Sequence, residues 1–372
     1  MVIENQNSEL RKIQFSGRTS FMVALPKKWA QEIGLRQGDV VKITPQNNRS
    51  LLITAKGLTS NVASESLTTA QVVIDPLTMR DNFGQVLRKI ISLYLNGYAN
   101  MDIEVACEGK LTSSQRTIIS ELVRRSLIGT EMIGTTLNGI SLKVLLNHSE
   151  LSIRDAVRRM FLVTSSMHNN AIKVLGSRDR HLVDSVLMSD DEVDRFCFYT
   201  IRQIHMAQKG EIDFQAIGLR QSSDLLTYLI AANVLESTAD LACRIAVECD
   251  KISEPIPDQI ATMLRTRSES AIGLVADSML SLFEHGYDGA EKVVQAVRTF
   301  GIQLEEDFAL AENRANSSNL QSCLSHLLTI LASIKLTAER ANDIAKAVLN
   351  LSASVAEPSS VEKVALAATA QI

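Results

Sequence analysis

Two pairs of carboxylates with the same spacing are the residues of this chain best suited to do chemistry. Glu236 and Asp240 stand four residues apart in an alanine-rich stretch, and Glu339 and Asp343 repeat that spacing far downstream. Four residues are about one helical turn, so the two acids of a pair lie on one helix face and repel unless a cation, a basic side chain or water compensates. Because the pair recurs in similar surroundings, we predict an internal duplication.

Long helices must position these acids. Residues 333–351 contain strong helix formers and no Gly or Pro, and small and branched apolar residues recur there at helical spacing. Helix stop and start signals divide the rest of this region in the same way. Pro255 and Pro257 separate two sets of three helices, which predicts two antiparallel three-helix bundles, 151–252 and 256–352. The predicted helices span 152–176, 180–209, 224–252, 259–285 (ending at Gly286), 288–313 and 320–351.

Carboxylates on facing helices of a bundle can bind iron, zinc, manganese or magnesium. None of the six histidines has the Glu-x-x-His spacing of di-iron sites, which disfavours an oxidase. The alternative is a solvated acidic face, or acids paired with Arg244, Lys335 or Arg340. The sequence contains no nucleophile elbow, Walker loop or HExxH motif, so we do not expect an enzyme.

Composition favours a mainly α protein of the cytoplasm. Aromatic residues make up only 4% of the chain, and no apolar run is long enough to span a bilayer, so membrane insertion is not expected. The five cysteines form no CxxC pair, which indicates reduced thiols.

Basic residues are concentrated at the start of the chain. Residues 1–56 contain nine Lys and Arg against four Asp and Glu, although the whole chain has a net charge of -4. A basic segment attached to an acidic body indicates a polyanionic partner. Short strands at 12–15, 21–25, 40–44 and 51–54 and a helix at 27–33 are predicted there, within a domain at 9–56. So small a β unit needs a partner to cover its apolar face.

A polar linker at 61–69 is predicted to lead into a small α/β domain, residues 70–147. Its expected role is that of a spacer or a dimer interface. The pattern predicts an N-cap at Ser113 or Ser114 and a two-residue hairpin turn at Asn138-Gly139. The predicted strands are 71–74, 101–107, 130–137 and 140–146, and the predicted helices are 79–95 and 113–127. Residues 353–372 are expected to be a flexible tail.

The first domain resembles the AbrB/MazE/SpoVT family of swapped-hairpin DNA-binding domains. The resemblance rests on Gly17, Leu25-Pro26-Lys27, Trp29, Gly34-Leu35 and Gly38-Asp39-Val40-Val41. It implies a homodimer whose basic loops lie on DNA; the alternative is that the domain only dimerises the chain. The implied DNA contacts are Arg11, Lys12, Arg18, Lys27 and Lys28.

The helical region resembles the PhoU family of phosphate-uptake regulators, tandem three-helix bundles whose third and sixth helices carry an acidic ExxxD motif. Glu236–Asp240 and Glu339–Asp343 match it, and the acids of 190–194 match the preceding helix of the first repeat. Phe300-Gly301 departs from the acidic start usual in the second repeat, and Ser237 replaces a common Arg. The implied metal ligands are Asp191, Asp194, Glu236, Asp240, Glu339 and Asp343.

With both segments in one chain, the protein resembles archaeal PhoU-type regulators that are fused to an AbrB-like domain. They imply a DNA-binding transcriptional regulator of phosphate uptake or homeostasis, with a sensing body that binds metal. The alternative is a phosphate-signalling adaptor that binds a transporter subunit or a kinase and uses its first domain only to dimerise. A metal-storage or redox bundle is a weaker third hypothesis.

Overall fold

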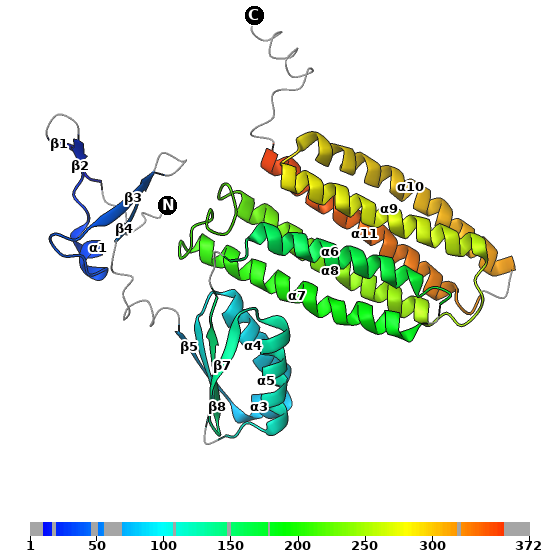
Figure 1. Cartoon of the computed structure of the whole chain (residues 1–372), viewed down its shortest axis with the longest axis horizontal. Coiled ribbons are helices and arrows are strands. Elements are labelled where there is room, and N and C mark those ends of the chain that lie inside the picture. The colour runs from blue at the N-terminus through cyan, green and yellow to red at the C-terminus, as the bar shows by residue number, and fades with distance from the viewer. Residues whose placement is uncertain are drawn as a thin grey trace, which may run out of the picture. The chain divides into compact units, whose positions relative to one another are not determined.

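The computed structural model describes residues 10–16, 20–45, 51–55, 69–106, 109–146, 150–177, 179–317 and 321–352 (Figure 1). The chain forms two compact units, Met1–Thr69 and Ala70–Ile372. Its class is the predicted one: mainly α, with tandem three-helix sets preceded by a small β unit and a small α/β region. The finer domain boundaries stay a prediction. Arg18 and the predicted tail lie outside the described residues.

The first unit contains two short antiparallel hairpins separated by a helix. Strands β1 (Gln14–Ser16) and β2 (Ser20–Met22) pair with Phe15 opposite Phe21, and the two rings meet edge to face at 4.7 Å. Helix α1 (Lys27–Glu32) begins directly after Pro26, as the sequence predicts. Strands β3 (Val41–Pro45) and β4 (Leu51–Ala55) form the second hairpin.

The middle domain, residues 69–146, is a four-stranded sheet with its helices on one side (Figure 1). Its strand order is β5-β6-β8-β7. The core between sheet and helices includes Ile90, Tyr94, Met101, Ile119 and Leu142, all buried. The elements are β5 (Thr69–Ile74), α3 (Pro76–Asp81), α4 (Phe83–Leu95), β6 (Asn100–Val105), α5 (Ser113–Ser126), β7 (Thr130–Thr135) and β8 (Gly139–Val144).

Three local predictions for this domain are wrong. The helix expected at 79–95 is two helices, because Asp75 caps α3 by accepting the Thr78 N–H (3.1 Å) and the chain breaks at Asn82, whose φ is -140°. The N-cap of α5 is Thr112, which forms a capping box with Gln115. In both cases the residue that caps the helix, Asp75 or Thr112, lies upstream of the predicted helix start.

The third wrong prediction concerns the turn between β7 and β8. Thr136 N–H donates to the carbonyl of Gly139 (2.9 Å), so Leu137 and Asn138 form the turn and Gly139 is the first residue of β8. A Cβ on Gly139 would lie 2.9 Å from the Ile103 carbonyl oxygen. The glycine therefore serves the close approach of β8 to β6 and not the turn.

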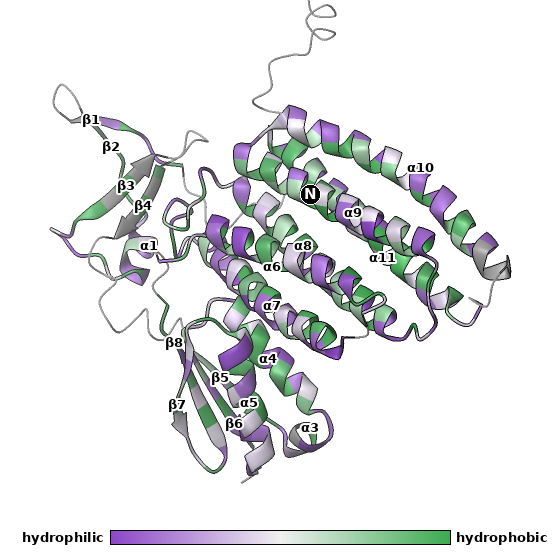
Figure 2. Ribbon diagram, turned by 45° about the vertical axis from the view of Figure 1, so that its right-hand side comes forward, coloured by the Kyte–Doolittle hydropathy of each residue, from purple (hydrophilic) through white to green (hydrophobic). Residues whose placement is uncertain are grey.

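The helical body, residues 150–352, consists of two sets of three helices that share one hydrophobic core. Helix α8 packs on α11 and α6 packs on α9, so the two sets meet along a seam. Each long helix carries both hydrophobic and hydrophilic residues (Figure 2). The helices are α6 (Ile153–Lys173), α7 (Arg180–Gln208), α8 (Asp224–Asp250), α9 (Asp258–Glu284), α10 (Tyr287–Ser317) and α11 (Leu324–Ser352).

The ends of these helices follow most of the predicted signals. Ser152 caps α6 by accepting the Asp155 N–H, and Gly176 and Gly210 follow α6 and α7 with positive φ. Helix α9 differs, because His285 and not Gly286 takes the left-handed conformation after it, at φ 54°. None of the helices that the structure describes is long and apolar enough to cross a bilayer.

One face of α7 joins the helical body to the middle domain. Arg202, His205 and Lys209 all reach the carbonyl groups at the C-terminal end of α4, where a helix leaves its last carbonyls without partners. Phe198 packs against the core of the middle domain, and Asp191 pairs with Arg125 of α5. These five residues recur at helical spacing, so they form a single stripe along α7, here called the docking stripe.

Candidate functional site

The acids of the first repeat form a cluster across α7 and α8. Asp190 and Asp194 of α7 lie near Glu236 and Asp240 of α8. Burial, followed by the charges of Asp194, Asp240, Glu236 and Asp191, raises the pKa of Asp190 to about 6. Burial and neighbouring carboxylates also raise the pKa of Asp194 and of Glu236. The cluster therefore holds negative charge that its protein surroundings do not fully neutralise.

Two thiols lie beside this acid cluster. Burial, together with the neighbouring carboxylates, raises the pKa of Cys197 and of Cys243 to about 12. Both are free cysteines, as are Cys249 and Cys323. A thiol with so high a pKa stays protonated at neutral pH, so neither is an activated nucleophile.

Asp191 and Asp194, both predicted metal ligands, face different neighbours. Asp194 lies in the cluster, whereas the Asp191 carboxylate accepts a hydrogen bond from Arg125 Nη1 at 3.3 Å and belongs to the docking stripe. Asp190, which was not among the predicted ligands, lies with the cluster instead. Helical spacing does not distinguish the two, because residues three and four apart are both neighbours on a helix face.

The second repeat pairs its acids with arginines. Arg340 Nη1 donates to Asp343 at 2.9 Å, and Glu339 is exposed. On α10, Asp307 is buried and pairs with Arg267 of α9 at 2.5 Å. The second ExxxD motif therefore differs from the first, because one of its two acids is already paired with an arginine.

The side-chain positions bear on the predicted metal site. In the parts of the chain that the structure describes, no three His, Cys, Asp or Glu side chains come close enough together to hold one metal ion. Carboxylates of the first cluster are the hard oxygen donors that such an ion takes, but they do not converge on one point. Metal binding, and the six ligands assigned to it, stay a prediction.

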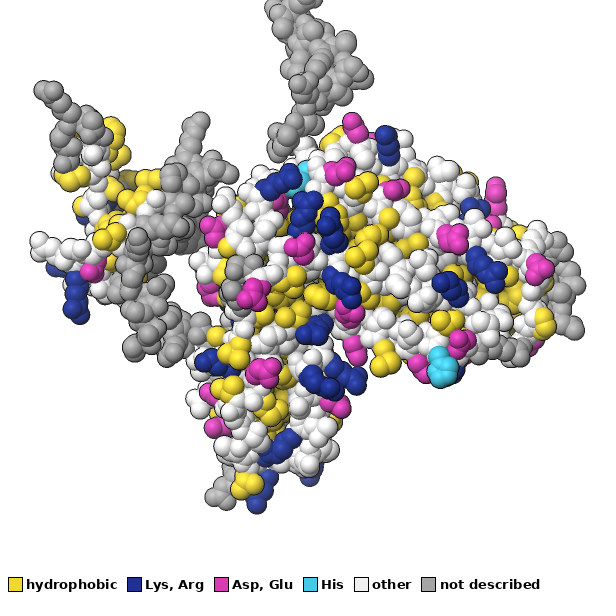
Figure 3. All heavy atoms as spheres, in the orientation of Figure 1, with side chains coloured by type: hydrophobic (Ala, Val, Ile, Leu, Met, Phe, Trp, Pro, Cys, Tyr) yellow, Lys and Arg dark blue, Asp and Glu magenta, His cyan; other side chains and the backbone are white. Residues whose placement is uncertain are grey.

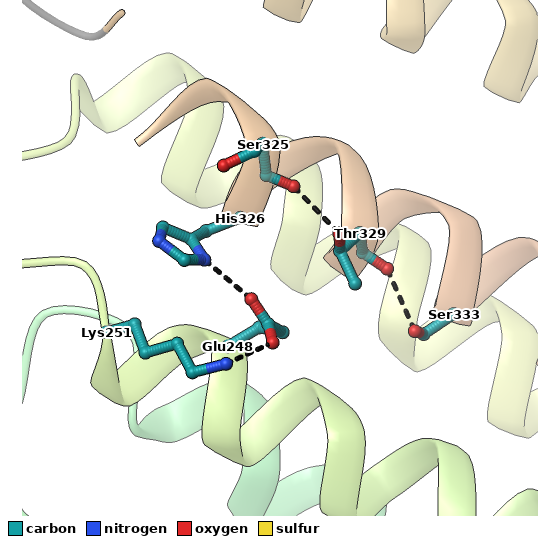
Figure 4. Close-up of polar contacts among 6 residues, drawn as sticks. All are labelled: Glu248, Lys251, Ser325, His326, Thr329 and Ser333. Carbon is teal, nitrogen blue, oxygen red and sulfur yellow. Dashed lines mark hydrogen bonds and ion pairs between the residues drawn. The ribbon is translucent and has the colours of Figure 1, made fainter. Parts of the chain in front are cut away.

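A polar contact connects the two repeats near one end of the body (Figure 4). His326 Nδ1 of α11 donates to Glu248 of α8 at 2.6 Å, and Lys251 donates to the other carboxylate oxygen at 2.7 Å. Burial raises the pKa of Glu248, but hydrogen bonds from Lys251 and His326 and their charges outweigh it and lower that pKa overall. Two basic side chains thus hold one carboxylate, and the His326 contact links α11 to α8.

The predicted DNA contacts of the first unit are surface residues. Arg11, Lys12, Lys27 and Lys28 are all exposed, and Arg18 lies outside the described residues. Lys27 and Lys28 form the first turn of α1. Lys27 and Lys28 thus present their charges at the surface of the first unit.

The first unit also exposes its apolar side chains. Within residues 10–45 and 51–55, no described side chain is buried. Ile43, in the second hairpin, is 55% exposed, and Phe21, in the first, is 72% exposed. The other large apolar residues exposed in this unit are Leu10, Ile13, Phe15, Met22, Val23, Val40 and Leu51.

Comparisons with known families support both resemblances. Residues 157–248, which span most of the first helical set, match the PhoU domain family. Residues 14–59 match the family described as "Antidote-toxin recognition MazE, bacterial antitoxin". Both resemblances inferred from the sequence are thereby confirmed for these segments.

Individual proteins are also similar to parts of this chain. The chain is 31% identical over 140 residues to the Phosphate-specific transport system accessory protein PhoU homolog 1 of Thermotoga maritima, which covers 36% of this chain and 56% of that protein. The chain therefore spans about half the length of this curated relative. The crystal structure of PhoU from Pseudomonas aeruginosa aligns with 54% of this chain and 96% of its own, at 16% identity and a TM-score of 0.48.

Proposed function

We propose that this chain is a dimeric DNA-binding regulator of phosphate homeostasis that acts in the cytoplasm. It has a PhoU-like segment that follows a MazE-like segment. The first unit would bind DNA, and the helical body would respond to the phosphate state of the cell. The observation that carries the proposal is the first unit itself, which combines surface cations with an uncovered apolar face.

Dimerisation is inferred from that apolar face. Isolated hairpins are at best marginally stable in water, and exposed apolar patches mark interaction surfaces. Burying apolar surface is worth roughly 25 cal/mol per Å², so a second copy that covers side chains such as Phe21 and Ile43 would stabilise both chains. A two-fold dimer also fits a palindromic or pseudo-palindromic DNA site.

DNA binding is inferred from the cations of the same unit. Residues 1–56 contain nine Lys and Arg against four acids, and Arg11, Lys12, Lys27 and Lys28 are exposed where the structure describes them. Cations that neutralise DNA phosphates release counterions, so affinity should fall steeply as salt rises.

The test is a titration of the full chain against genomic DNA fragments at several salt concentrations, with excess nonspecific competitor. The same titration is made for a variant that lacks residues 1–56 and for Lys27→Ala with Lys28→Ala. We expect salt-sensitive binding that survives competitor, is abolished by the deletion and is weakened by the double substitution. Lys292→Ala with Lys346→Ala, which removes two lysines of the helical body, is the matched control and should leave DNA affinity unchanged.

A second candidate function is a phosphate-signalling adaptor that does not bind DNA. The match to a phosphate-specific transport system accessory protein favours it, as does the match of residues 157–248 to the PhoU domain family. In this case the first unit would only dimerise the chain, and the body would bind a transporter subunit or a kinase. Absence of DNA binding in the titration above, with and without phosphate, would favour the adaptor.

Metal binding is proposed for the acid cluster of the first repeat and not for the ExxxD motif of the second repeat. Its support is the uncompensated charge around Asp190, whereas Asp343 already pairs with Arg340. The carboxylates would have to rotate to coordinate one ion of iron, zinc, manganese or magnesium. Metal-free protein should gain thermal stability on titration with these ions. Glu236→Gln with Asp240→Asn should abolish that gain and Glu339→Gln with Asp343→Asn should not; equal effects would contradict the proposal.

A further inference from the structure

Basic side chains from three elements gather at the seam between the two repeats. Arg154 and Arg158 lie on α6, Arg220 precedes α8, and His285 follows α9. Lys and Arg side chains are concentrated over the neighbouring ends of α6 and α9 in the space-filling view (Figure 3). We refer to these four residues as the seam cluster. It lies outside the acid cluster and outside the first unit.

An aromatic ring organises the two arginines of α6. The guanidinium carbons of Arg154 and Arg158 lie 5.2 and 5.3 Å from the centroid of the Phe283 ring of α9. The two arginines are one turn apart, so they reach the same ring from the same helix face. Stacking on an aromatic ring fixes a guanidinium while leaving its N–H groups free to donate.

The side chains of Arg154 and Arg158 have no acidic partner among the described residues, unlike other arginines of the body. Arg159, next to Arg158, donates to Glu192 at 2.8 Å, and Arg267 pairs with Asp307. Neither Arg154 nor Arg158 forms an ion pair or a hydrogen bond with any residue that the structure describes. Their donors are therefore available to a ligand.

One acid, Asp224, lies beside the cluster, and one of its two carboxylate oxygens is already engaged. Its side chain is buried, and its Oδ2 accepts the backbone N–H groups of Arg220 (2.9 Å) and Gln221 (3.2 Å). It therefore organises the start of α8 and carries one negative charge against three arginines. The pKa of His285 reflects this balance, because burial and the charges of Arg220 and Arg154 lower it, although Asp224 opposes them.

We propose that the seam cluster binds a small phosphate-bearing anion, with Arg154 and Arg158 as paired donors and Arg220 as a third. Guanidinium groups match phosphate oxygens bidentately, and such charge-assisted hydrogen bonds are stronger than neutral ones. The same chemistry suits inorganic phosphate or the phosphate of a nucleotide. All three donors belong to the first repeat, and two of them stack on Phe283 of the second, so the bound anion would lie at the seam between the repeats. The proposal rests on the arginine geometry and is independent of DNA binding by the first unit.

The test is isothermal titration calorimetry of the full chain in a phosphate-free buffer without DNA. The chain is titrated separately with inorganic phosphate, adenosine monophosphate and acetate, all at equal ionic strength. Arg154→Gln with Arg158→Gln should weaken phosphate binding roughly tenfold or more, because the double substitution removes at least one charge-assisted hydrogen bond to the anion. Arg159→Gln is the matched control on the same helix, since Arg159 is paired with Glu192, and should stay within about twofold of the parent chain.

The outcomes separate the possibilities. Tighter binding of inorganic phosphate identifies the free anion as the ligand, and tighter binding of adenosine monophosphate identifies a phosphate ester. No binding of either up to about 10 mM, binding equal to that of acetate, or equal losses in the double variant and in Arg159→Gln would overturn the proposal. Circular dichroism checks folding, and Arg220→Gln, outside the α6 helix, provides a second variant that must also weaken binding.

Discussion

The guanidinium of Arg202 lies 4.9 Å from the centroid of the Tyr94 ring, and its Nη1 donates to the Tyr94 carbonyl at 2.5 Å. The same side chain donates to the carbonyls of Tyr98 and Gly97, each at 3.1 Å. Arg202 is 2% exposed, so a buried cation of the helical body satisfies the carbonyl groups at the end of α4. A basic side chain at a helix C-terminus also complements the helix dipole.

Arg202→Met should destabilise the second unit by roughly 3 kcal/mol, because it keeps the apolar stem but leaves buried carbonyl groups without donors. Denaturant unfolding of the full chain measures the change. Arg180→Met, at the other end of the same helix, removes an arginine that is 73% exposed and should cost about 1 kcal/mol or less. Equal losses in the two variants would show that the α4 contacts do not stabilise the junction.

The acid cluster makes stability depend on pH. The pKa of Asp190 is about 6 in the folded chain, above its ordinary value of 3.8, so between these values the folded state binds more protons than the unfolded state. Stability should therefore fall as pH rises from about 4 to 6 and stay low above. With chelator present, Asp190→Asn should flatten this slope and raise stability at neutral pH. Asp184→Asn, an exposed acid on α7, should leave the slope unchanged, and a slope that persists in Asp190→Asn contradicts the assignment.

The Glu248 contact should show the opposite dependence. Its pKa is lowered in the folded chain from 4.5, so its contribution is present above that value and is lost as pH falls through the lower folded value. Glu248→Gln should cost about 1 kcal/mol at neutral pH and little in acid, since the carboxylate is then protonated in both states. Unfolding at neutral and acidic pH measures this difference, and a cost that does not depend on pH would exclude the ionic contribution.

The exposed face of the first unit predicts the oligomeric state. Ile43→Asp should convert a dimer into a monomer, because it places a charge on a surface that we expect a second copy to bury. Sedimentation of the full chain measures the change. Leu162→Asp, on α6, is the matched control, since Leu162 is 54% exposed and Ile43 is 55% exposed. Dimers that resist Ile43→Asp but dissociate with Leu162→Asp would place the interface on the helical body.

The sequence predicts the helix order well, because short-range signals such as the Ser152 cap, Gly176 and Gly210 mark the helix ends. It does not predict which face of α7 meets α8, because that depends on packing. The sequence therefore places Asp191 among the metal ligands, whereas the structure pairs it with Arg125. The seam cluster is harder still, since Arg154 and Phe283 are distant in the sequence and become neighbours only when the two repeats pack together.

The docking stripe has a mechanical consequence. Helix α7 has 29 residues and is therefore about 44 Å long, and its stripe contacts the middle domain at Asp191 and, about three turns later, at Arg202. Two attachment points on one stiff rod leave no pivot between them. Helix α7 and the middle domain would then move as one rigid body, so any displacement of the acidic segment of α7 against α8 would carry the middle domain with it.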